Sequence, residues 1–371
     1  MFESWDFRQI QSVSYFCSQK ELGTRVNARV EERQRSHLWL RIQRRDGSFG
    51  YSCLSPLEKM GDLGELQLLQ ILRECLKQSA LGLSTSEILS SYYSQYPQAG
   101  GFEVLVKSLD FNFSFESLLN QFFQSQNELQ KIENNFFIGD FRQISELQLQ
   151  EIIQQGFSRV KIKLGREDLS DFYNWAKGMR HCELALRLDF NAALTSAEYL
   201  SFVNWACEFF FSSIQPLRLE YVEDPCAFSI LQGISFEQDE ILQVPVFLDR
   251  EINFAEAYRW LHPSVKGLVL KPSQQRLDQA LRLAEILKLD LRFTHYVDTD
   301  LSRVFSLSEL LTKDAAFKKK HLFGEAQGFL MGALAHDEVS LVFEQGPYLQ
   351  FNEAGLGSFK RFCDQARWLS L

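Results

Sequence analysis

Hydrophobic and polar positions in the first third of the chain alternate at first with a period of two and later with helical spacing. The expected strands are residues 27–33, 36–44 and 49–53, and the expected helices are residues 65–80, 84–96 and 114–131. Asp46-Gly47 is a typical hairpin turn between the second and third strands. Ser84-Thr85-Ser86-Glu87 is a good N-cap signal for the second helix. This part of the chain is therefore predicted to be a mixed α+β unit.

From residue 136 onward, short apolar runs alternate with amphipathic segments, a rhythm typical of parallel βαβ units. The expected strands are residues 136–139, 159–164, 184–189, 218–223, 244–249, 267–271, 289–294 and 321–324, and the expected helices are residues 146–155, 169–179, 197–210, 254–261, 277–287 and 303–311. About eight such strands are enough to close a barrel. The fold class predicted from the pattern is therefore α/β, a TIM (β/α) barrel with an appended α+β domain.

Composition narrows the class of protein. The chain has 371 residues, of which 45% are hydrophobic, and a formal net charge of −9 without blocks of lysine and arginine. A nucleic-acid partner is not expected, because phosphate binding needs a clustered basic surface. The N-terminal residues lack a signal-peptide pattern and no apolar run has the length of a membrane span, so we expect a cytoplasmic protein without a membrane partner. Seven cysteines without a Cys-x-x-Cys pair are expected to be reduced, packed thiols.

Charged residues end several of the expected barrel strands. They are Lys163, Asp189, Glu223, Asp249 and Lys271, each about one βα unit from the next. In a parallel barrel the carboxyl ends of the strands form one rim, which is where such barrels place their active sites. Three carboxylates on neighbouring strands suit a hard divalent cation such as Mg²⁺, with a lysine on either side of it.

Lys161 and Lys163 lie two residues apart in one of these strands, so their ammonium groups point to the same face. Lysine is almost never fully buried without a partner. This pair therefore predicts carboxylates, a metal site or an anionic ligand opposite the strand.

These strand ends resemble those of a known family. Lys161-Ile162-Lys163, Asp189-Phe190-Asn191, Glu223-Asp224-Pro225, Leu248-Asp249-Arg250-Glu251 and Lys271-Pro272 are similar to the K-x-K, D-x-N, E-[DE]-P, D-E and K-P motifs of the enolase superfamily, in its muconate-lactonizing subgroup. The residues around them are most similar to the o-succinylbenzoate synthase family of menaquinone biosynthesis. The similarity covers residues 134–327 and extends weakly to residues 50–57, which resemble a capping loop over the active site.

The resemblance implies a reaction and a role for each strand end. The family removes a proton from a carbon next to a carboxylate, and Mg²⁺, with Mn²⁺ as an alternative, would be held by Asp189, Glu223 and Asp249 to stabilise the enediolate. Lys163 would be the base and, in a dehydration, the acid that returns the proton to the departing hydroxide. Lys271 would stabilise the enediolate as a cation, and Lys161 would help to lower the pKa of Lys163.

The expectations for Arg187 and Asn191, in and just after the strand that ends at Asp189, are less specific. Asn191 is expected to support the metal ligands without contacting the ion. Arg187 faces inward like Asp189 by the two-residue period, and it either binds a substrate carboxylate or pairs with a neighbouring acid; the sequence leaves both readings open.

Some positions depart from the family pattern. Arg250 stands where the subgroup usually has an acid, His295 lies on the seventh expected strand, and Asp298-Thr299-Asp300 resembles a dipeptide-epimerase motif one strand too early. We expect His295 to be a packed or lining residue, because Lys271 occupies the strand position at which a partner aspartate would be needed.

The functional hypothesis is Mg²⁺-dependent dehydration of a cyclohexadiene carboxylate that carries a succinyl side chain, with a small-molecule carboxylate as the only expected partner and an unknown oligomeric state. The alternative from another reaction class is an N-acylamino acid racemase or dipeptide epimerase with Lys163 and Lys271 as two bases. A degenerate barrel kept as a binding module is disfavoured by the complete set of charged strand ends. The expected domains are residues 1–133, the capping domain, 134–327, the barrel, and 328–371, a segment that returns to the capping domain, with specificity loops near residues 17–25 and 51–61.

Overall fold

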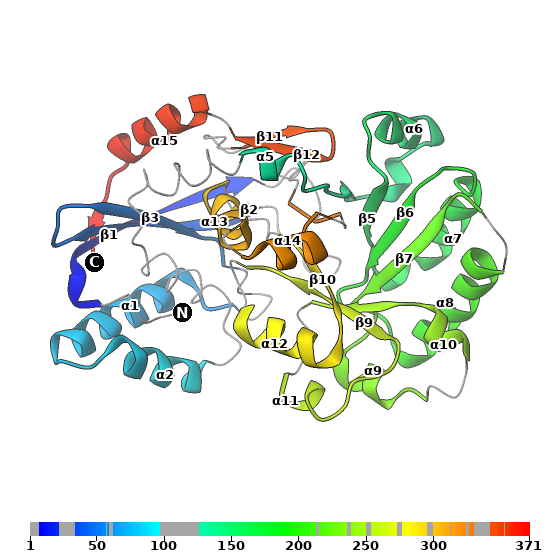
Figure 1. Ribbon diagram of the computed structural model, residues 1–371, viewed down its shortest axis with the longest axis horizontal. Coiled ribbons are helices and arrows are strands. Elements are labelled where there is room, and N and C mark those ends of the chain that lie inside the picture. The colour runs from blue at the N-terminus through cyan, green and yellow to red at the C-terminus, as the bar shows by residue number, and fades with distance from the viewer. Residues whose placement is uncertain are drawn as a thin grey trace.

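The computed structural model describes most of the barrel and the greater part of the capping domain (Figure 1). The described residues are 7–21, 34–56, 58, 62–96, 126–212, 215–235, 239–249, 254–272, 277–294, 300–311, 313–323, 326–329, 342–351 and 353–371.

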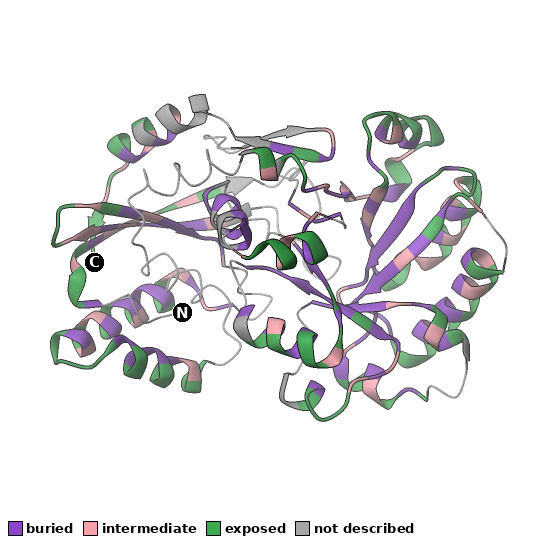
Figure 2. Cartoon of the chain, viewed as in Figure 1, coloured by how far each residue is buried: buried purple, intermediate pink, exposed green. Residues whose placement is uncertain are grey.

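The barrel is built on a seven-stranded parallel sheet in the order β10-β9-β8-β7-β6-β5-β4. Its strands are β4 (Phe136–Ile138), β5 (Arg159–Lys163), β6 (Ala185–Asp189), β7 (Arg218–Glu223), β8 (Val246–Leu248), β9 (Val265–Leu270) and β10 (Asp290–Phe293). The central strands are buried and the helices outside them present exposed residues to solvent (Figure 2). Burial on both faces explains why these strands are nearly continuous apolar runs.

Helices on the outside of the sheet connect these strands. They are α6 (Glu146–Gln154), α7 (Leu169–Gly178), α8 (Ser196–Ala206), α9 (Phe228–Gly233), α10 (Asp239–Gln243), α11 (Phe254–Ala257) and α12 (Leu277–Leu287), and two further helices, α13 (Asp300–Leu311) and α14 (Ala315–His321), follow the last strand, β10. The Ser145–Gln148 and Thr195–Glu198 capping boxes start α6 and α8, because each side chain accepts a bond from an otherwise unpaired backbone N–H.

The expected eighth strand over residues 321–324 is wrong for residues 321–323, and Gly324 lies outside the described residues. His321 is the last residue of α14, and the sheet is closed a few residues later by isolated parallel bridges from Gln327 to Asn134 and from Gly328 to Thr294. The buried Gln327 side chain supplies further closure, because its Oε1 accepts from the Phe293 N–H at 2.8 Å. The two bridges and the hydrogen bond of the Gln327 side chain therefore take the place of a longer eighth strand.

The capping domain contains an antiparallel sheet in the order β13-β1-β2-β3. Its strands are β1 (Ile10–Glu21), β2 (Gln34–Arg44), β3 (Phe49–Leu54) and β13 (Leu369–Ser370). The β2–β3 hairpin turns where predicted, with Gly47 at φ 85°, a conformation that glycine adopts at little cost. The pairing of β13 with β1 brings the C-terminal end of the chain back to the N-terminal sheet.

Helices cover both faces of this sheet (Figure 1). On one face lie α1 (Glu65–Ala80) and α2 (Thr85–Gln95), which share an apolar core with Val13, Leu38 and Leu40. On the other lies α15 (Glu353–Gln365), whose Phe362 ring is 5.0 Å from the ring of Trp39. The expected fold class, a modified barrel with a capping domain built from both ends of the chain, is confirmed. The exact domain boundaries stay a prediction.

Other expectations for the capping region have mixed outcomes. The expected loop at residues 17–25 is wrong for residues 17–21, which belong to β1, and the strand expected over 27–33 lies outside the described residues. Of the helix expected over 114–131, the described part is α5 (Gln126–Leu129). The tail contains the hairpin of β11 (Val342–Gln345) and β12 (Tyr348–Phe351).

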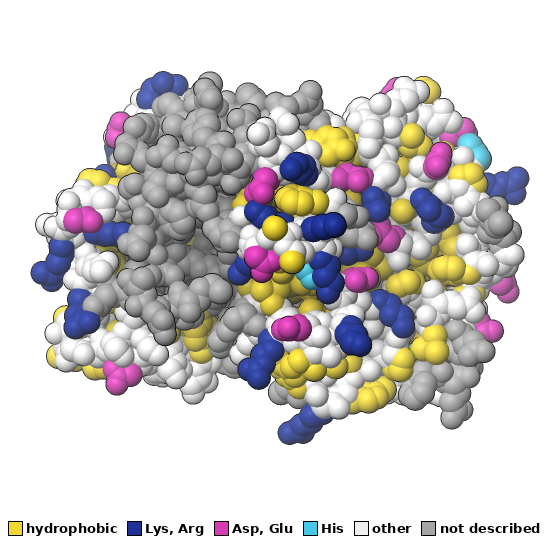
Figure 3. Space-filling view, in the orientation of Figure 1, with side chains coloured by type: hydrophobic (Ala, Val, Ile, Leu, Met, Phe, Trp, Pro, Cys, Tyr) yellow, Lys and Arg dark blue, Asp and Glu magenta, His cyan; other side chains and the backbone are white. Residues whose placement is uncertain are grey.

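On the face shown in Figure 3, lysine and arginine side chains of the described residues are interspersed with acidic ones rather than gathered in a stripe. In the described part of the chain, every helix is too short or too polar to cross a membrane.

Candidate active site

The sheet register brings the predicted charged residues to one rim. Lys163 is the direct neighbour of Asp189 across β5 and β6, and Asp189 is the direct neighbour of Glu223 across β6 and β7. Asp249 and Lys271 directly follow β8 and β9, the next two strands of the sheet. The five residues therefore lie at the carboxyl ends of consecutive strands, as expected from their spacing.

The ammonium group of Lys161 lies between two of the carboxylates. Its Nζ donates to both oxygens of Glu223 at 2.7 Å and is 3.0 Å from Oδ2 of Asp189. All three side chains are nearly removed from solvent, with 13% of the Lys161 side chain, 5% of Asp189 and 1% of Glu223 exposed. Charge neutralisation between close partners is what allows these groups to be buried together.

The other two lysines flank the carboxylates from opposite sides. The Lys163 Nζ is 3.8 Å from Oδ2 of Asp189, and the Lys271 Nζ donates to Oδ2 of Asp249. Strands β6, β7 and β8 lie between β5, which carries Lys163, and β9, which precedes Lys271. A substrate above the carboxylates would therefore have one lysine on either side.

The two lysines of β5 differ in their electrostatics. Burial lowers the pKa of Lys163, and the ammonium groups of Lys161 and Lys271 add to this effect against the opposing charge of Asp189. Burial also opposes the charge on Lys161, but the carboxylates of Asp189 and Glu223 outweigh it and raise the Lys161 pKa well above the ordinary value. Lys163 is therefore the lysine of β5 that is better suited to give up its proton near neutral pH.

The three carboxylates of the rim have the donor chemistry of a site for a divalent cation. Asp189, Glu223 and Asp249 offer only oxygen donors on neighbouring strand ends, the donor set that Mg²⁺ and Mn²⁺ prefer. Lysine ammonium groups contact these carboxylates in the structure. Among the described residues, no three His, Cys, Asp or Glu side chains converge on one point. The donor chemistry of the three carboxylates therefore fits the ion.

Asn191 supports the first of the three carboxylates. Its Nδ2 donates to Oδ1 of Asp189 at 2.8 Å and its backbone N–H donates to the same oxygen at 3.2 Å. Asn191 adopts φ 48°, in the left-handed region that asparagine tolerates better than most residues. This contact agrees with a supporting role, although the role itself stays a prediction.

Beneath the charged rim lies a small apolar layer inside the barrel. Tyr221 and Phe247 stack with ring centroids 4.1 Å apart, and Val269 completes the buried cluster. Each stands two residues before a rim position, so the same two-residue period that places Glu223 inward places Tyr221 inward. A second group of charges lies next to this layer, because the Arg187 and Arg292 guanidinium groups stand 5.1 and 5.3 Å from the centres of the Tyr221 and Phe247 rings.

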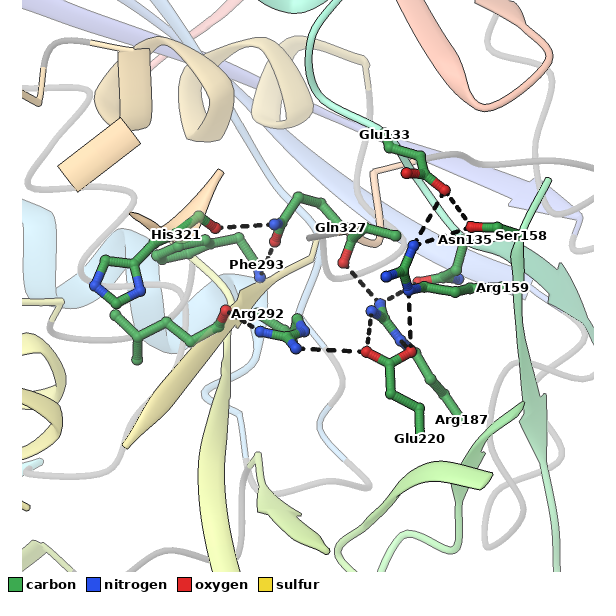
Figure 4. A network of polar contacts seen from close by, with 12 residues as sticks. Glu133, Asn135, Ser158, Arg159, Arg187, Glu220, Arg292, Phe293, His321 and Gln327 are labelled. Atoms are coloured by element: carbon green, nitrogen blue, oxygen red, sulfur yellow. Dashed lines mark hydrogen bonds and ion pairs between the residues drawn. The ribbon is translucent and has the colours of Figure 1, made fainter. Parts of the chain in front are cut away.

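Arg187 belongs to that second group, and it is the direct neighbour of Tyr221 across β6 and β7 (Figure 4). Its Nε and Nη2 donate to the two carboxylate oxygens of Glu220 at 2.9 and 2.8 Å, and its Nη1 donates to Oδ1 of Asn135 and to the carbonyl of Ala326. Arg159 and Arg292 also contact Glu220, at 3.3 and 3.4 Å. Of the two readings of Arg187, these contacts favour the ion pair over a substrate carboxylate.

Sequence reasoning missed Glu220 because of a local irregularity. A strict period of two places Glu220 on the outer face of β7, opposite to Tyr221 and Glu223. The register between β6 and β7 shifts between Leu186 and Arg187, and Glu220 meets the inward guanidinium of Arg187. A single arginine in a strand was the only signal that a buried acid was needed.

Several positions at which the sequence departs from the family pattern cannot be compared with the structure. Arg250, His295 and Asp298 lie outside the described residues.

Comparisons with known proteins are consistent with this geometry. No family model matches the chain. A curated relative, o-succinylbenzoate synthase of Bdellovibrio bacteriovorus, is 24% identical over 353 residues, which cover 93% of this chain and 94% of that protein.

Solved structures share the fold over nearly the whole chain. A dipeptide epimerase of Enterococcus faecalis, in complex with Mg and the dipeptide L-Leu-L-Tyr, has a TM-score of 0.66 at 14% identity and covers 93% of this chain and 98% of its own. An o-succinylbenzoate synthase of Thermosynechococcus elongatus, with Mg in its active site, has a TM-score of 0.60 at 18% identity and covers 96% of this chain and 100% of its own.

The resemblance to the enolase superfamily inferred from the strand ends is confirmed, because the curated relative and the structural neighbours are o-succinylbenzoate synthases, dipeptide epimerases and a mandelate racemase/muconate lactonizing protein. The curated relative is an o-succinylbenzoate synthase, whereas the structures that share the fold include both an o-succinylbenzoate synthase and dipeptide epimerases.

Proposed function

We propose that this protein is an o-succinylbenzoate synthase, which dehydrates 2-succinyl-6-hydroxy-2,4-cyclohexadiene-1-carboxylate to o-succinylbenzoate in the cytoplasm as a step of menaquinone biosynthesis. The observation that carries the proposal is the position of Lys163, an amine with a lowered pKa at the rim, beside Asp189 and opposite Lys271. The full-length likeness to a synthase of Bdellovibrio bacteriovorus supports this choice of substrate.

The chain's own residues account for the proton transfers. The neutral amine of Lys163 takes the proton from the ring carbon that bears the carboxylate, and the electron pair of the broken C–H bond is delocalised into that carboxylate. The pair then returns to form the ring double bond as the C–O bond to the hydroxyl group breaks. The Lys163 ammonium gives its proton to the leaving hydroxide, so one water is released and the ring becomes aromatic.

The charge that develops on the carboxylate needs cationic partners. Asp189, Glu223 and Asp249 would hold Mg²⁺, or Mn²⁺ as the alternative, and the bound ion supplies a Lewis acid for the substrate carboxylate. Lys271 would stabilise the same charge from the face opposite Lys163. Lys161 would keep Glu223 and Asp189 together and hold the pKa of Lys163 down.

The test compares the two substrate classes on one preparation. The purified chain is given MgCl₂ and either the succinyl-cyclohexadiene carboxylate, followed by ultraviolet absorbance, or a set of dipeptides and N-acyl amino acids, followed by solvent deuterium incorporation. We expect a kcat/KM for the diene at least about 100-fold above that for any amino acid derivative, and no turnover in excess EDTA. Turnover of the amino acid derivatives alone would overturn the proposal.

A second candidate is a racemase or epimerase of N-acylated amino acids or dipeptides. It is favoured by the two lysines on opposite sides of the carboxylates and by the fold similarity to dipeptide epimerases. Lys271→Arg separates the two-base reaction from the dehydration. If the protein is an epimerase, this variant should exchange the substrate's α-proton for solvent deuterium in one enantiomer of the substrate only. Exchange from both enantiomers would contradict the two-base assignment.

A further inference from the structure

Asp224, the residue after Glu223, connects the loops that follow three neighbouring strands. Its backbone N–H donates to the carbonyl of Phe247 in β8 at 3.0 Å, and its own carbonyl accepts from the N–H of Ala192, just past β6, at 2.5 Å. Its side-chain Oδ1 accepts from the N–H of Asp249 at 3.0 Å. Asp224 is thereby bonded to the backbone of Ala192, just past Asp189 in the chain, and to the backbone N–H of Asp249.

The conformation of Asp224 is costly, and its surroundings impose it. Asp224 has φ 40°, in the left-handed region that few residues other than glycine adopt, and only 3% of it is exposed. Ala192, its partner across the rim, also has a positive φ of 57°. A buried acid in a strained conformation persists only where several contacts hold it together, and here those contacts all lead to the rim.

The bond to Asp249 is the contact with the clearest consequence. Strand β8 has only three residues, Val246–Leu248, so the regular ladder ends just before Asp249. A hydrogen bond to the Asp249 N–H fixes the peptide from which this carboxylate projects. It therefore restricts the directions in which the carboxylate can point.

We propose that Asp224 is a positioning residue for the divalent cation: through its side-chain acceptor it fixes the main chain of Asp249 and so aligns that carboxylate with Asp189 and Glu223. The inference rests on the proposed function, because it takes these three carboxylates as the ligands. Asp224 itself contacts neither the ion nor the substrate in this role. Such supporting partners typically change metal affinity by about 10-fold to 100-fold when they are removed.

Two substitutions separate this role from a purely structural one. Asp224→Asn keeps an oxygen acceptor and a residue type that tolerates positive φ. Asp224→Gly removes the acceptor and relieves the backbone strain, so the protein loses the bond to Asp249 without gaining a steric problem. Lys288→Gly is the matched control, because exposed Lys288 also has a positive φ, 55°, but lies at the end of α12.

The experiment is calorimetric titration of each full-length protein with MgCl₂, alongside thermal unfolding without metal. We expect Asp224→Gly to weaken the Mg²⁺ dissociation constant by about 10-fold to 100-fold with a Tm within about 3 °C of wild type, and Asp224→Asn to stay within about 3-fold. Lys288→Gly should leave the dissociation constant unchanged.

Four results would overturn the inference. Wild-type affinity in Asp224→Gly would show that the bond to Asp249 does not matter for the ion, and an equal loss in Asp224→Asn would show that the acceptor is not the cause. Should Asp224→Gly not fold, the Asn variant decides alone: retained affinity supports the inference and a 10-fold loss overturns it. Absence of Mg²⁺ binding in the wild-type protein would overturn the proposed metal site as well, which distinguishes that failure from the others.

Discussion

Arg187 and Glu220 form a two-pronged ion pair inside the barrel, with Nε and Nη2 of the arginine 2.9 and 2.8 Å from the two carboxylate oxygens. Only 1% of the Arg187 side chain and 17% of Glu220 is exposed. The pair lies beside the apolar layer of Tyr221 and Phe247, and the Arg187 guanidinium stands 5.1 Å from the centre of the Tyr221 ring. Its chief contribution is therefore to the stability of the barrel interior.

Removal of this arginine should destabilise the fold. Arg187→Met leaves Glu220 buried with fewer donors, and breaking a buried pair from one side typically costs about 3–5 kcal/mol. We expect that loss in the free energy of unfolding measured in urea, with a KM for the substrate close to that of wild type. Arg166→Ala is the control, because its partner Glu198 is reached across an exposed surface and such pairs contribute about 0–1 kcal/mol. A raised KM at unchanged stability would restore the substrate-binding reading of Arg187.

The same pair predicts how stability depends on pH. Burial alone would raise the pKa of Glu220, but Arg187, with Arg292 and Arg159, outweighs it and holds that pKa below the ordinary glutamate value of 4.5. A group whose pKa is lower in the folded state stabilises the protein fully above the unfolded-state pKa, and this stabilisation is lost as the pH falls through the folded-state value.

Glu220→Gln removes this titration. We expect the difference in unfolding free energy between wild type and Glu220→Gln to be constant near neutral pH and to shrink as the pH falls below about 4.5. Exposed Glu183 provides the control variant, Glu183→Gln, which should follow the wild-type curve. A difference that grows toward acid pH would contradict the assigned direction of the pKa shift.

Gly267 makes room for the aromatic layer under the rim. It is the direct neighbour of Phe247 across β8 and β9, and a Cβ atom at this position would lie 2.2 Å from the Phe247 ring. Gly267→Ala must push that ring, which stands two residues before Asp249, out of its stack with Tyr221. We expect a loss of about 1–3 kcal/mol in unfolding free energy, as is typical of an overpacked core, with weaker Mg²⁺ binding.

Gly178→Ala is the matched control for this substitution. A Cβ atom on Gly178, at the end of α7, would meet no heavy atom within 4 Å. Its unfolding free energy should stay within about 0.5 kcal/mol of wild type. Equal stability of the two alanine variants would show that the Phe247 ring can move at little cost.

The sequence predicted the rim far better than the closure of the barrel. Charged residues that end apolar runs, such as Asp189 and Glu223, give a strong signal, because each breaks a pattern that burial otherwise enforces. The eighth strand gave no such signal: closure there rests on the buried side chain of Gln327 and two bridges, and a lone glutamine has no periodicity.

The first strand was missed for a related reason. Val13 faces the core shared with α1 and α2, whereas Phe16 packs against Trp39 and Phe362 on the other face of the sheet. A strand that is covered on both faces loses the alternation by which a half-buried strand is recognised. The proposed role of Asp224 could not be predicted from the sequence either, because it depends on a hydrogen bond from the backbone N–H of Asp249 to the Asp224 side chain. These two residues follow different strands.

The central claim is that Lys163 transfers the proton in a Mg²⁺-dependent dehydration, and the most direct measurement is diene turnover by Lys163→Ala under ultraviolet absorbance with saturating MgCl₂. The exposed Lys177→Ala serves as the control, and calorimetry confirms that both variants still bind Mg²⁺. We predict that Lys163→Ala loses at least about 10³-fold in kcat while Lys177→Ala and the wild type turn over equally. Turnover by metal-bound Lys163→Ala at the wild-type rate would contradict the account.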